Sequence, residues 1–259
     1  MNKPPRILVS NDDGIHAPGI AALVEVASEF GEVITVAPLY AQSGMGHAIS
    51  LSKPLRIKEH DIFPNIKSYS VNGTPADCVK LATGVLMDVQ PDLIVSGINH
   101  GYNSSVSSIY SGTLSAAREG AIQGIPSIGF SLGDFSHEAD MSAAKVAARA
   151  VLEKAIAHQL RPGQLLNVNV PYLPIEEIKG IKIVRMAMGR WVEEFAERVD
   201  PYGRKYYWLT GNFSLQDEGE DTDIHALEDG YVSVTPMTHD LTQYQEIAPL
   251  TQWHFELKK

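Results

Sequence analysis

The chain has 259 residues, a formal net charge of −10 and a hydrophobic fraction of 44%. This length supports one large domain or two small ones, and it can bury a full core without disulfide or metal staples. The single cysteine, Cys78, excludes an internal disulfide framework and a multi-cysteine zinc site, and is typical of a reducing compartment. The acidic balance argues against nucleic-acid binding through a broad basic surface, so we expect no duplex partner.

The beginning of the chain predicts no secretion signal and no membrane partner. The apolar run at residues 7–9 is too short for the core of a signal peptide, and no stretch approaches the length of a membrane span. We therefore expect a cytoplasmic protein. A small phosphorylated ligand stays compatible with the negative charge, because backbone N–H groups and a bound cation can hold an anion in a pocket.

The first two-thirds of the chain alternate strand-like and helix-like segments. Short apolar runs predict strands, and apolar residues spaced at i, i+3, i+4 and i+7 predict helices. The expected strands are residues 6–10, 33–36, 93–96, 127–131 and 165–170, and the expected helices are residues 19–30, 111–123 and 141–158. This alternation predicts an α/β fold, a Rossmann-like three-layer sandwich with a mostly parallel sheet.

A further helix is expected after Thr74, because a hydroxyl N-cap, a proline and an acid follow one another at residues 74–77. Apolar residues then recur at helical spacing from Cys78 as far as Val85 and Val89. This pattern makes Cys78 a buried helix residue rather than a reactive thiol.

The pattern changes after about residue 186. Residues 190–215 are aromatic and charged without a clean period, and residues 231–235 alternate like a strand. We assign residues 1–186 to an α/β catalytic domain. We assign residues 187–259 to a β-rich C-terminal extension of the same compact unit. Residues 191–259 hold 11 of the 20 aromatic residues, which favours a role in oligomerisation over packing on the chain's own sheet.

Candidate chemistry lies at the expected strand ends, because ligands of parallel sheets bind beyond the carboxyl ends of the strands. The first strand ends in Asn11-Asp12-Asp13-Gly14, and two adjacent acids either hold a hard divalent cation or form a solvated turn. Their adjacency argues against an aspartyl-phosphate phosphatase, which needs two acids separated by one residue.

Ser43 and Asn99 follow later strands and could supply a hydroxyl and an amide oxygen, although each also suits an ordinary loop. His47 is a lone loop histidine that could act as a general acid or simply be solvated.

The sequence Ser111-Gly112-Thr113 opens a predicted helix, where free N–H groups suit a phosphate and the hydroxyls suit N-capping. It is not a Walker loop, because no lysine follows the glycine, and no dinucleotide fingerprint follows the first strand. All candidate ligands are oxygen donors, which predicts a metal-dependent hydrolase of a phosphate ester. A non-catalytic nucleotide sensor is the alternative, but it would not need two adjacent acids.

These motifs together resemble the SurE (survival protein E) nucleotidases. The resemblance rests on residues 11–14, 42–44, 73–78, 96–103 and 110–113, with weaker similarity at residues 222–223 and 230–236. It implies a phosphatase that hydrolyses nucleoside 5′- and 3′-monophosphates, with polyphosphate as a further substrate. It also implies homodimers or homotetramers with an exchanged C-terminal segment.

By motif position, the resemblance implies one divalent cation per subunit, Mg²⁺ or Mn²⁺, held by Asp12, Asp13, Ser43 and Asn99. It places the phosphate near Asn11 and the helix start. We therefore expect catalysis by Asp12, Asp13 and Asn11, without distinguishing which acid acts on water. The expected phosphate contacts are Asn11, Asn99, Ser111, Gly112 and Thr113. One departure is that Leu39 and Tyr40 replace the acid and arginine common in relatives, which affects the expected substrate preference.

Overall fold

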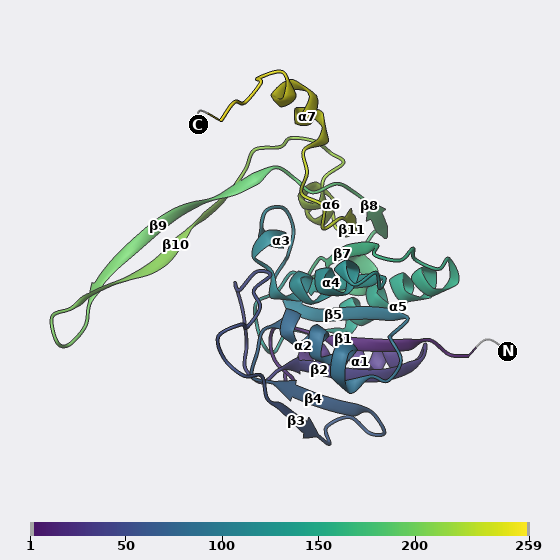
Figure 1. The fold of residues 1–259 in the computed structure, drawn as a ribbon. Coiled ribbons are helices and arrows are strands. Elements are labelled where there is room, and N and C mark those ends of the chain that lie inside the picture. Colours follow the sequence, from purple (N-terminus) through teal and green to yellow (C-terminus); the bar gives the residue numbers. More distant parts are fainter. Residues whose placement is uncertain (1–2, 258–259) are drawn as a thin grey trace.

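The computed structural model describes residues 3–257. Nine strands form one sheet in the order β3-β4-β2-β1-β5-β6-β7-β11-β8 (Figure 1). Parallel pairing joins β4, β2, β1, β5, β6 and β7 in succession, whereas β3 and β7 pair antiparallel with β4 and β11. The strands are β1 Arg6–Ser10, β2 Glu32–Pro38, β3 Ile57–His60, β4 Lys67–Val71, β5 Leu93–His100, β6 Ser127–Leu132, β7 Leu165–Val170, β8 Ile181–Ile183 and β11 Val232–Met237.

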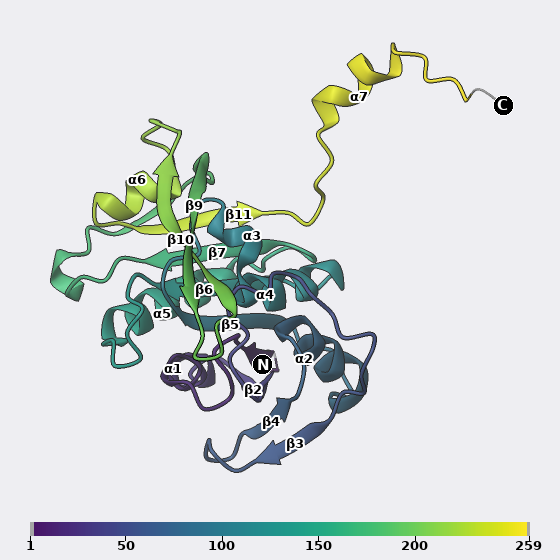
Figure 2. The ribbon, with the colours of Figure 1, turned by 90° about the vertical axis from the view of Figure 1, so that its left-hand side faces the viewer.

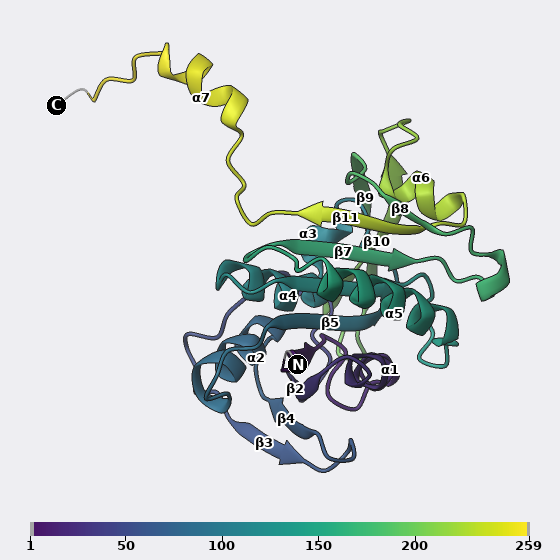
Figure 3. The ribbon, with the colours of Figure 1, turned by 90° about the vertical axis from the view of Figure 1, so that its right-hand side faces the viewer.

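Helices cover both faces of this sheet. One hydrophobic core lies beneath α1 and α5, which contact each other, and a second lies beneath α2 and α4 (Figure 3). The expected three-layer α/β architecture is therefore confirmed. The helical segments are α1 Pro18–Ser28, α2 Pro75–Leu81, η1 Ala82–Leu86, α3 Ser107–Tyr110, α4 Gly112–Ile122, α5 Ser142–Ala157, η2 Ile175–Glu177, α6 Asp223–Glu228 and α7 Tyr244–Thr251.

The strands β1 and β5 bring the candidate motifs to one edge of the sheet. Ile7, Leu8 and Val9 are fully buried, and β1 pairs in parallel with β5 up to the register of Ser10 with Ser96. The carboxyl ends of both strands therefore point to the same rim. The Asp12–Asp13 pair follows the end of β1, and Asn99 lies at the end of β5, which runs four residues beyond the expected end at residue 96.

The helix after Thr74 is shorter than its apolar spacing predicts. Thr74 and Asp77 form the expected capping box, but α2 ends at Leu81 and continues as the π-helical turn η1. Val85 and Val89 are 67% and 57% exposed, so the extension of the buried face to Val89 was wrong. The Thr83 carbonyl accepts a hydrogen bond from the Gln90 side chain at 2.9 Å, which replaces the hydrogen bond that a regular helix would make there. Cys78 itself is fully buried, as expected.

Residues 189–215 form a long two-stranded hairpin, which confirms the expected β-rich extension, although its individual strands were not predicted. Its strands, β9 Gly189–Val199 and β10 Lys205–Leu215, pair antiparallel along their whole length and project from the body (Figure 1). Every residue of both strands is exposed or half-buried. Strand alternation in a sequence arises when one face is buried, so a hairpin with two open faces lacks that signal.

The C-terminal part of the chain returns to the sheet and then leaves it. β11 lies between β7 and β8, close to the expected strand at residues 231–235. Beyond it, α7 lies away from the body, and each of its residues is exposed (Figures 2 and 3). The division at residue 186 stays a prediction. Within residues 3–257, no helix is long and apolar enough to cross a membrane.

Candidate active site

The turn after β1 is braced by Asn11. Its side-chain Nδ2 donates to the Gly14 carbonyl at 2.9 Å, and its Oδ1 accepts from the Gly14 N–H at 3.2 Å. Gly14 has a φ of +101°, a conformation that favours glycine. Both polar atoms of Asn11 therefore hold the turn that carries the two acids. The amide nitrogen has a second hydrogen, which is compatible with the expected phosphate contact.

Asp12 is buried against the start of α4. Burial, together with the charge of Asp13, raises the pKa of Asp12 from 3.8 to about 7. The Thr113 hydroxyl donates to Asp12 Oδ1 at 2.5 Å. A Cβ at Gly112 would lie 2.6 Å from the Asp12 Cβ, so only glycine allows the helix to approach this closely. The acid pair and the helix start are therefore one packed unit.

Asp13 has a buried oxygen without a partner in the described structure. Burial raises the pKa of Asp13, and the nearby rings of His100 and His137 oppose that shift. Its Oδ2 is buried and lacks a hydrogen-bond partner among residues 3–257. A buried carboxylate oxygen is costly unless a proton or a cation satisfies it. This atom, beside a second acid, fits a divalent cation.

Two neutral side chains can complete an oxygen-donor set. The N–H of Gln42 donates to the Asp12 carbonyl at 2.7 Å, which brings the exposed Ser43 next to the acid pair. The Nδ2 of Asn99 donates to the carbonyls of His100 and Gly101 at 3.1 and 2.8 Å, so its oxygen is left to act as a ligand. Such donors suit Mg²⁺ or Mn²⁺.

No group of three or more His, Cys, Asp or Glu side chains that could hold a metal occurs in the described part of the chain. A site built on two acids is compatible with this finding only if neutral oxygens complete it. Ser43 and Asn99 are therefore the residues on which the predicted cation site depends.

The start of α4 offers N–H groups for an anion. The hydroxyl of Ser111 accepts from the Leu114 N–H at 3.1 Å, so Ser111 is the N-cap, and its own hydrogen is left to donate. The Thr113 hydroxyl hydrogen is used on Asp12. The expected contribution of Thr113 to a phosphate site therefore reduces to its backbone N–H, as for Gly112. The first N–H groups of a helix favour a phosphate both by hydrogen bonding and by the helix dipole.

An ion cluster around the buried Glu119 supports the loop that carries Ser43. His47 Nε2 lies 3.0 Å from Glu119 Oε2, and the Lys80 ammonium lies 2.8 Å from Glu119 Oε1. Burial alone would raise the pKa of Glu119, but hydrogen bonds to His47 and Lys80 outweigh it and lower the pKa from 4.5 to about 2. The N–H of Gly46 also donates to the Tyr110 carbonyl at 3.0 Å. His47 thus ties its loop to α4.

The sequence interpretation missed Glu119. The available signal was an acid among small apolar residues on one helix, since Ala116, Ala117, Gly120 and Ala121 surround it in the chain and are buried. A charged residue in such a position needs a buried partner. Nothing in the local sequence identified His47 or Lys80 as that partner, because they come from other elements.

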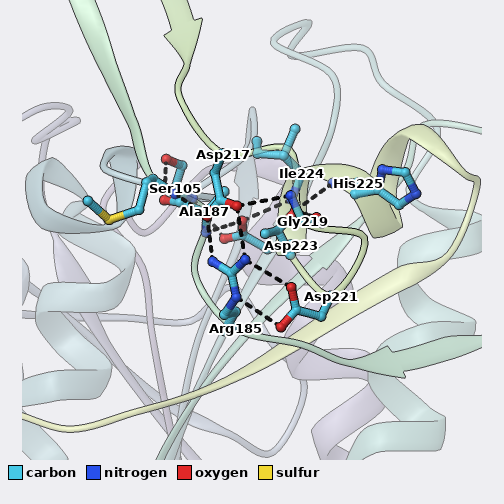
Figure 4. Close-up of polar contacts among 11 residues, drawn as sticks. Ser105, Arg185, Ala187, Asp217, Gly219, Asp221, Asp223, Ile224 and His225 are labelled. Carbon is cyan, nitrogen blue, oxygen red and sulfur yellow. Dashed lines mark hydrogen bonds and ion pairs between the residues drawn. The ribbon is translucent and has the colours of Figure 1, made fainter.

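A second polar cluster fixes the base of the hairpin (Figure 4). The buried Asp223 carboxylate accepts from the N–H groups of Ser105 and Ala187 at 2.8 and 2.9 Å. Arg185 bridges Asp217, which follows β10, and Asp221 (Figure 4). These contacts join the segments before β9 and after β10 to the loop between β5 and α3. The hairpin base therefore has a defined position relative to the start of α4.

Comparison with known proteins identifies relatives along almost the whole chain. The profile of the family described as survival protein SurE matches residues 7–193. Proteins named 5′-nucleotidase SurE from Cytophaga hutchinsonii and Christiangramia forsetii are 53% and 54% identical to this chain, and each alignment covers 98% of it and 99% and 98% of the relative. The crystal structure of the SurE protein from Aquifex aeolicus superposes with a TM-score of 0.82 at 38% identity, covering 97% of this chain and all of that one.

Proposed function

Because the chain belongs to the survival protein SurE family, we propose that it is a 5′-nucleotidase, a hydrolase that releases inorganic phosphate from nucleoside 5′-monophosphates. The observation that carries this proposal is the unpartnered Oδ2 of Asp13 beside the buried Asp12, whose carboxylate accepts from Thr113 at the start of α4. A cation-binding acid pair next to an anion-binding helix start suits a phosphate ester.

We assign the cation to Asp12, Asp13, Ser43 and Asn99. When bound, a divalent cation polarises the phosphoryl group and lowers the pKa of adjacent water. The N–H groups at the start of α4 stabilise the charge on the equatorial phosphoryl oxygens. A carboxylate of the acid pair accepts a proton from the attacking water as the water oxygen bonds to phosphorus. The P–O5′ bond breaks on the opposite side of the phosphorus atom, and the leaving 5′ oxygen takes a proton from solvent water.

The proposal extends to finer properties that rest on the sequence interpretation. Nucleoside 3′-monophosphates and polyphosphate are further proposed substrates, and one Mg²⁺ or Mn²⁺ per subunit is the proposed cofactor. A cytoplasmic location stays a prediction. Leu39 lies next to the turn that carries the acids, because its carbonyl lies near Gly14. Its N–H donates to the Val71 carbonyl at 2.8 Å, which holds Leu39 against β4.

We also propose a homodimer or homotetramer assembled through residues 187–259. Support comes from the apolar side chains that the hairpin, α7 and the residues just after α7 leave exposed, which include Phe195, Trp208, Tyr244 and Trp253. Exposed aromatic groups of this kind are enriched in protein–protein interfaces. A second copy of the chain would cover them.

The substrate range is tested by measuring phosphate release from 5′- and 3′-nucleotides and polyphosphate, each with Mg²⁺, Mn²⁺ or Co²⁺. We expect 5′-monophosphates to be hydrolysed in the presence of at least one of these cations. Hydrolysis of a generic ester such as p-nitrophenyl phosphate with no hydrolysis of any nucleotide would contradict the proposed substrate class.

A further inference from the structure

The hairpin and the candidate active site enclose a cavity of about 400 Å³. Gly44 and Tyr110 line one side, and Trp191, Glu193, Leu209 and Gly211 of the hairpin line the other. This volume lies in the range of small-molecule sites. The cavity is distinct from the acid pair and the helix start, and the function derived so far does not use it.

The cavity lies next to the place where the substrate's phosphate is proposed to bind. Gly44 follows the proposed cation ligand Ser43, and Tyr110 precedes the N-cap Ser111. The two loops are joined, because the Gly46 N–H donates to the Tyr110 carbonyl at 3.0 Å. The cavity therefore opens directly beside both the proposed cation site and the proposed phosphate site. A substrate whose phosphate lies at the helix start has its remaining atoms within reach of this cavity.

The lining suits a flat, uncharged group. Tyr110 and Trp191 are 53% and 45% exposed, so much of each side chain is open to a ligand. Aromatic faces stack on nucleobases without regard to their identity. Glu193 adds a carboxylate, which repels a phosphate and accepts hydrogen bonds from base amino groups or ribose hydroxyls. The lining thus excludes the phosphate and favours the nucleoside.

The wall formed by the hairpin is held in place. The Trp191 ring packs edge-to-face on Phe213 with their centroids 5.7 Å apart, and its Nε1 lies 3.4 Å from the Ser107 hydroxyl. The Asp223 cluster fixes the hairpin base against the loop that leads to α3 (Figure 4). Trp191 is therefore oriented before any ligand binds.

We propose that this cavity binds the nucleoside part of the substrate, with Trp191 and Tyr110 stacking on the base. This inference rests on the proposed nucleotidase function and adds to it the residues that select nucleotides over other phosphate esters. It assigns substrate selection to the hairpin, outside the acid pair and the helix start.

The test compares adenosine 5′-monophosphate with ribose 5-phosphate, which has the same sugar and phosphate but no base. Trp191→Ala is expected to raise the KM for the nucleotide about tenfold, since loss of one stacking contact weakens binding by roughly 5- to 150-fold. The KM for ribose 5-phosphate is expected to stay unchanged. Trp191→Phe retains an aromatic ring and is expected to keep most of the preference.

Tyr202→Ala is the matched control, because Tyr202 lies in the turn of the same hairpin, is 84% exposed and does not line the cavity. Thermal unfolding and light scattering of each variant establish whether its fold and mass are those of the wild type. An equal change in KM for both substrates, or no change for the nucleotide, would overturn the inference. So would the finding that Trp191→Ala alters only the oligomeric mass, because the cavity would then receive a second copy of the chain.

Calorimetry with adenosine separates this inference from the proposed function. Adenosine carries no phosphate, and its binding requires no hydrolysis. We expect wild-type protein to bind it and Trp191→Ala to lose most of that binding. If the wild type binds adenosine through Trp191 but hydrolyses no nucleotide, the proposed function fails while the nucleoside site stands. If it hydrolyses nucleotides and Trp191→Ala binds adenosine normally, only the nucleoside site fails.

Discussion

Asp13 is the single residue whose environment most directly points to a cation. Its buried Oδ2 lacks a partner in the described structure, and its neighbour Asp12 has a pKa raised to about 7. Asp13→Asn keeps the shape and removes the charge, so we expect the affinity for Mn²⁺ to fall at least about 100-fold, the upper range for loss of a supporting residue. Electron paramagnetic resonance of free Mn²⁺ measures this directly. Unchanged Mn²⁺ binding in Asp13→Asn would contradict the assignment, and Asp61→Asn, an exposed acid, is the control.

Glu119 makes the free energy of unfolding depend on pH in the acid range. Its pKa is about 2 in the folded protein instead of 4.5, so its carboxylate stabilises the fold above pH 4.5. That contribution, at most about 3 kcal/mol, is lost as the pH falls toward 2. We expect Glu119→Gln to be less stable than the wild type at pH 7 but nearly equal to it near pH 2. Chemical denaturation across this range measures the difference, with the exposed Glu153→Gln as control. A difference in the free energy of unfolding between wild type and Glu119→Gln that stayed the same at every pH would exclude this role of Glu119.

Among the elements, the start of α4 has two roles that one substitution can separate. The Ser111 hydroxyl caps the helix, and we assign the adjoining N–H groups to the phosphate. Ser111→Ala is expected to cost about 1 kcal/mol of stability through the lost cap and to weaken inhibition by phosphate or vanadate. Mn²⁺ affinity is expected to stay within about twofold of the wild type. Calorimetry with both ligands checks this, and a loss of cation affinity at unchanged phosphate affinity would show that Ser111 serves the cation.

The sequence predicts elements best where burial imposes a period. The strands β1, β2, β5, β6 and β7 and the helices α1, α4 and α5 lie within a few residues of their expected positions, because each strand is a buried apolar run and each helix buries a regular apolar face. The short strands β3 and β4 were missed. The hairpin β9–β10 has no buried face, so it carries no alternation to read. The candidate acids were predictable because they follow a strand directly, whereas the contact between His47 and Glu119 spans 72 residues of chain and depends on the tertiary fold.

For the whole molecule, the exposed apolar surface of the hairpin and α7 leads to a prediction about mass. Each protomer has a mass of 28.3 kDa, and we expect light scattering to give a multiple of it at low micromolar concentration. Truncation after His239 removes α7 but retains β11, so the sheet stays intact. We expect the truncated chain to form a particle with fewer subunits than the full-length assembly, or to aggregate, because apolar surface on the partner would lose its cover. A full-length particle with the mass of one protomer would contradict the proposed assembly.

The central claim is that the acid pair after β1 holds a divalent cation needed to release phosphate from a nucleotide. The most direct test is phosphate release from adenosine 5′-monophosphate by full-length protein, first stripped with excess chelator and then supplied with Mg²⁺ or Mn²⁺. We expect release at background level in chelator and recovery when the cation is restored. Full activity in excess chelator would contradict the role of the cation, and no release with either cation would contradict the proposed hydrolysis of nucleotides.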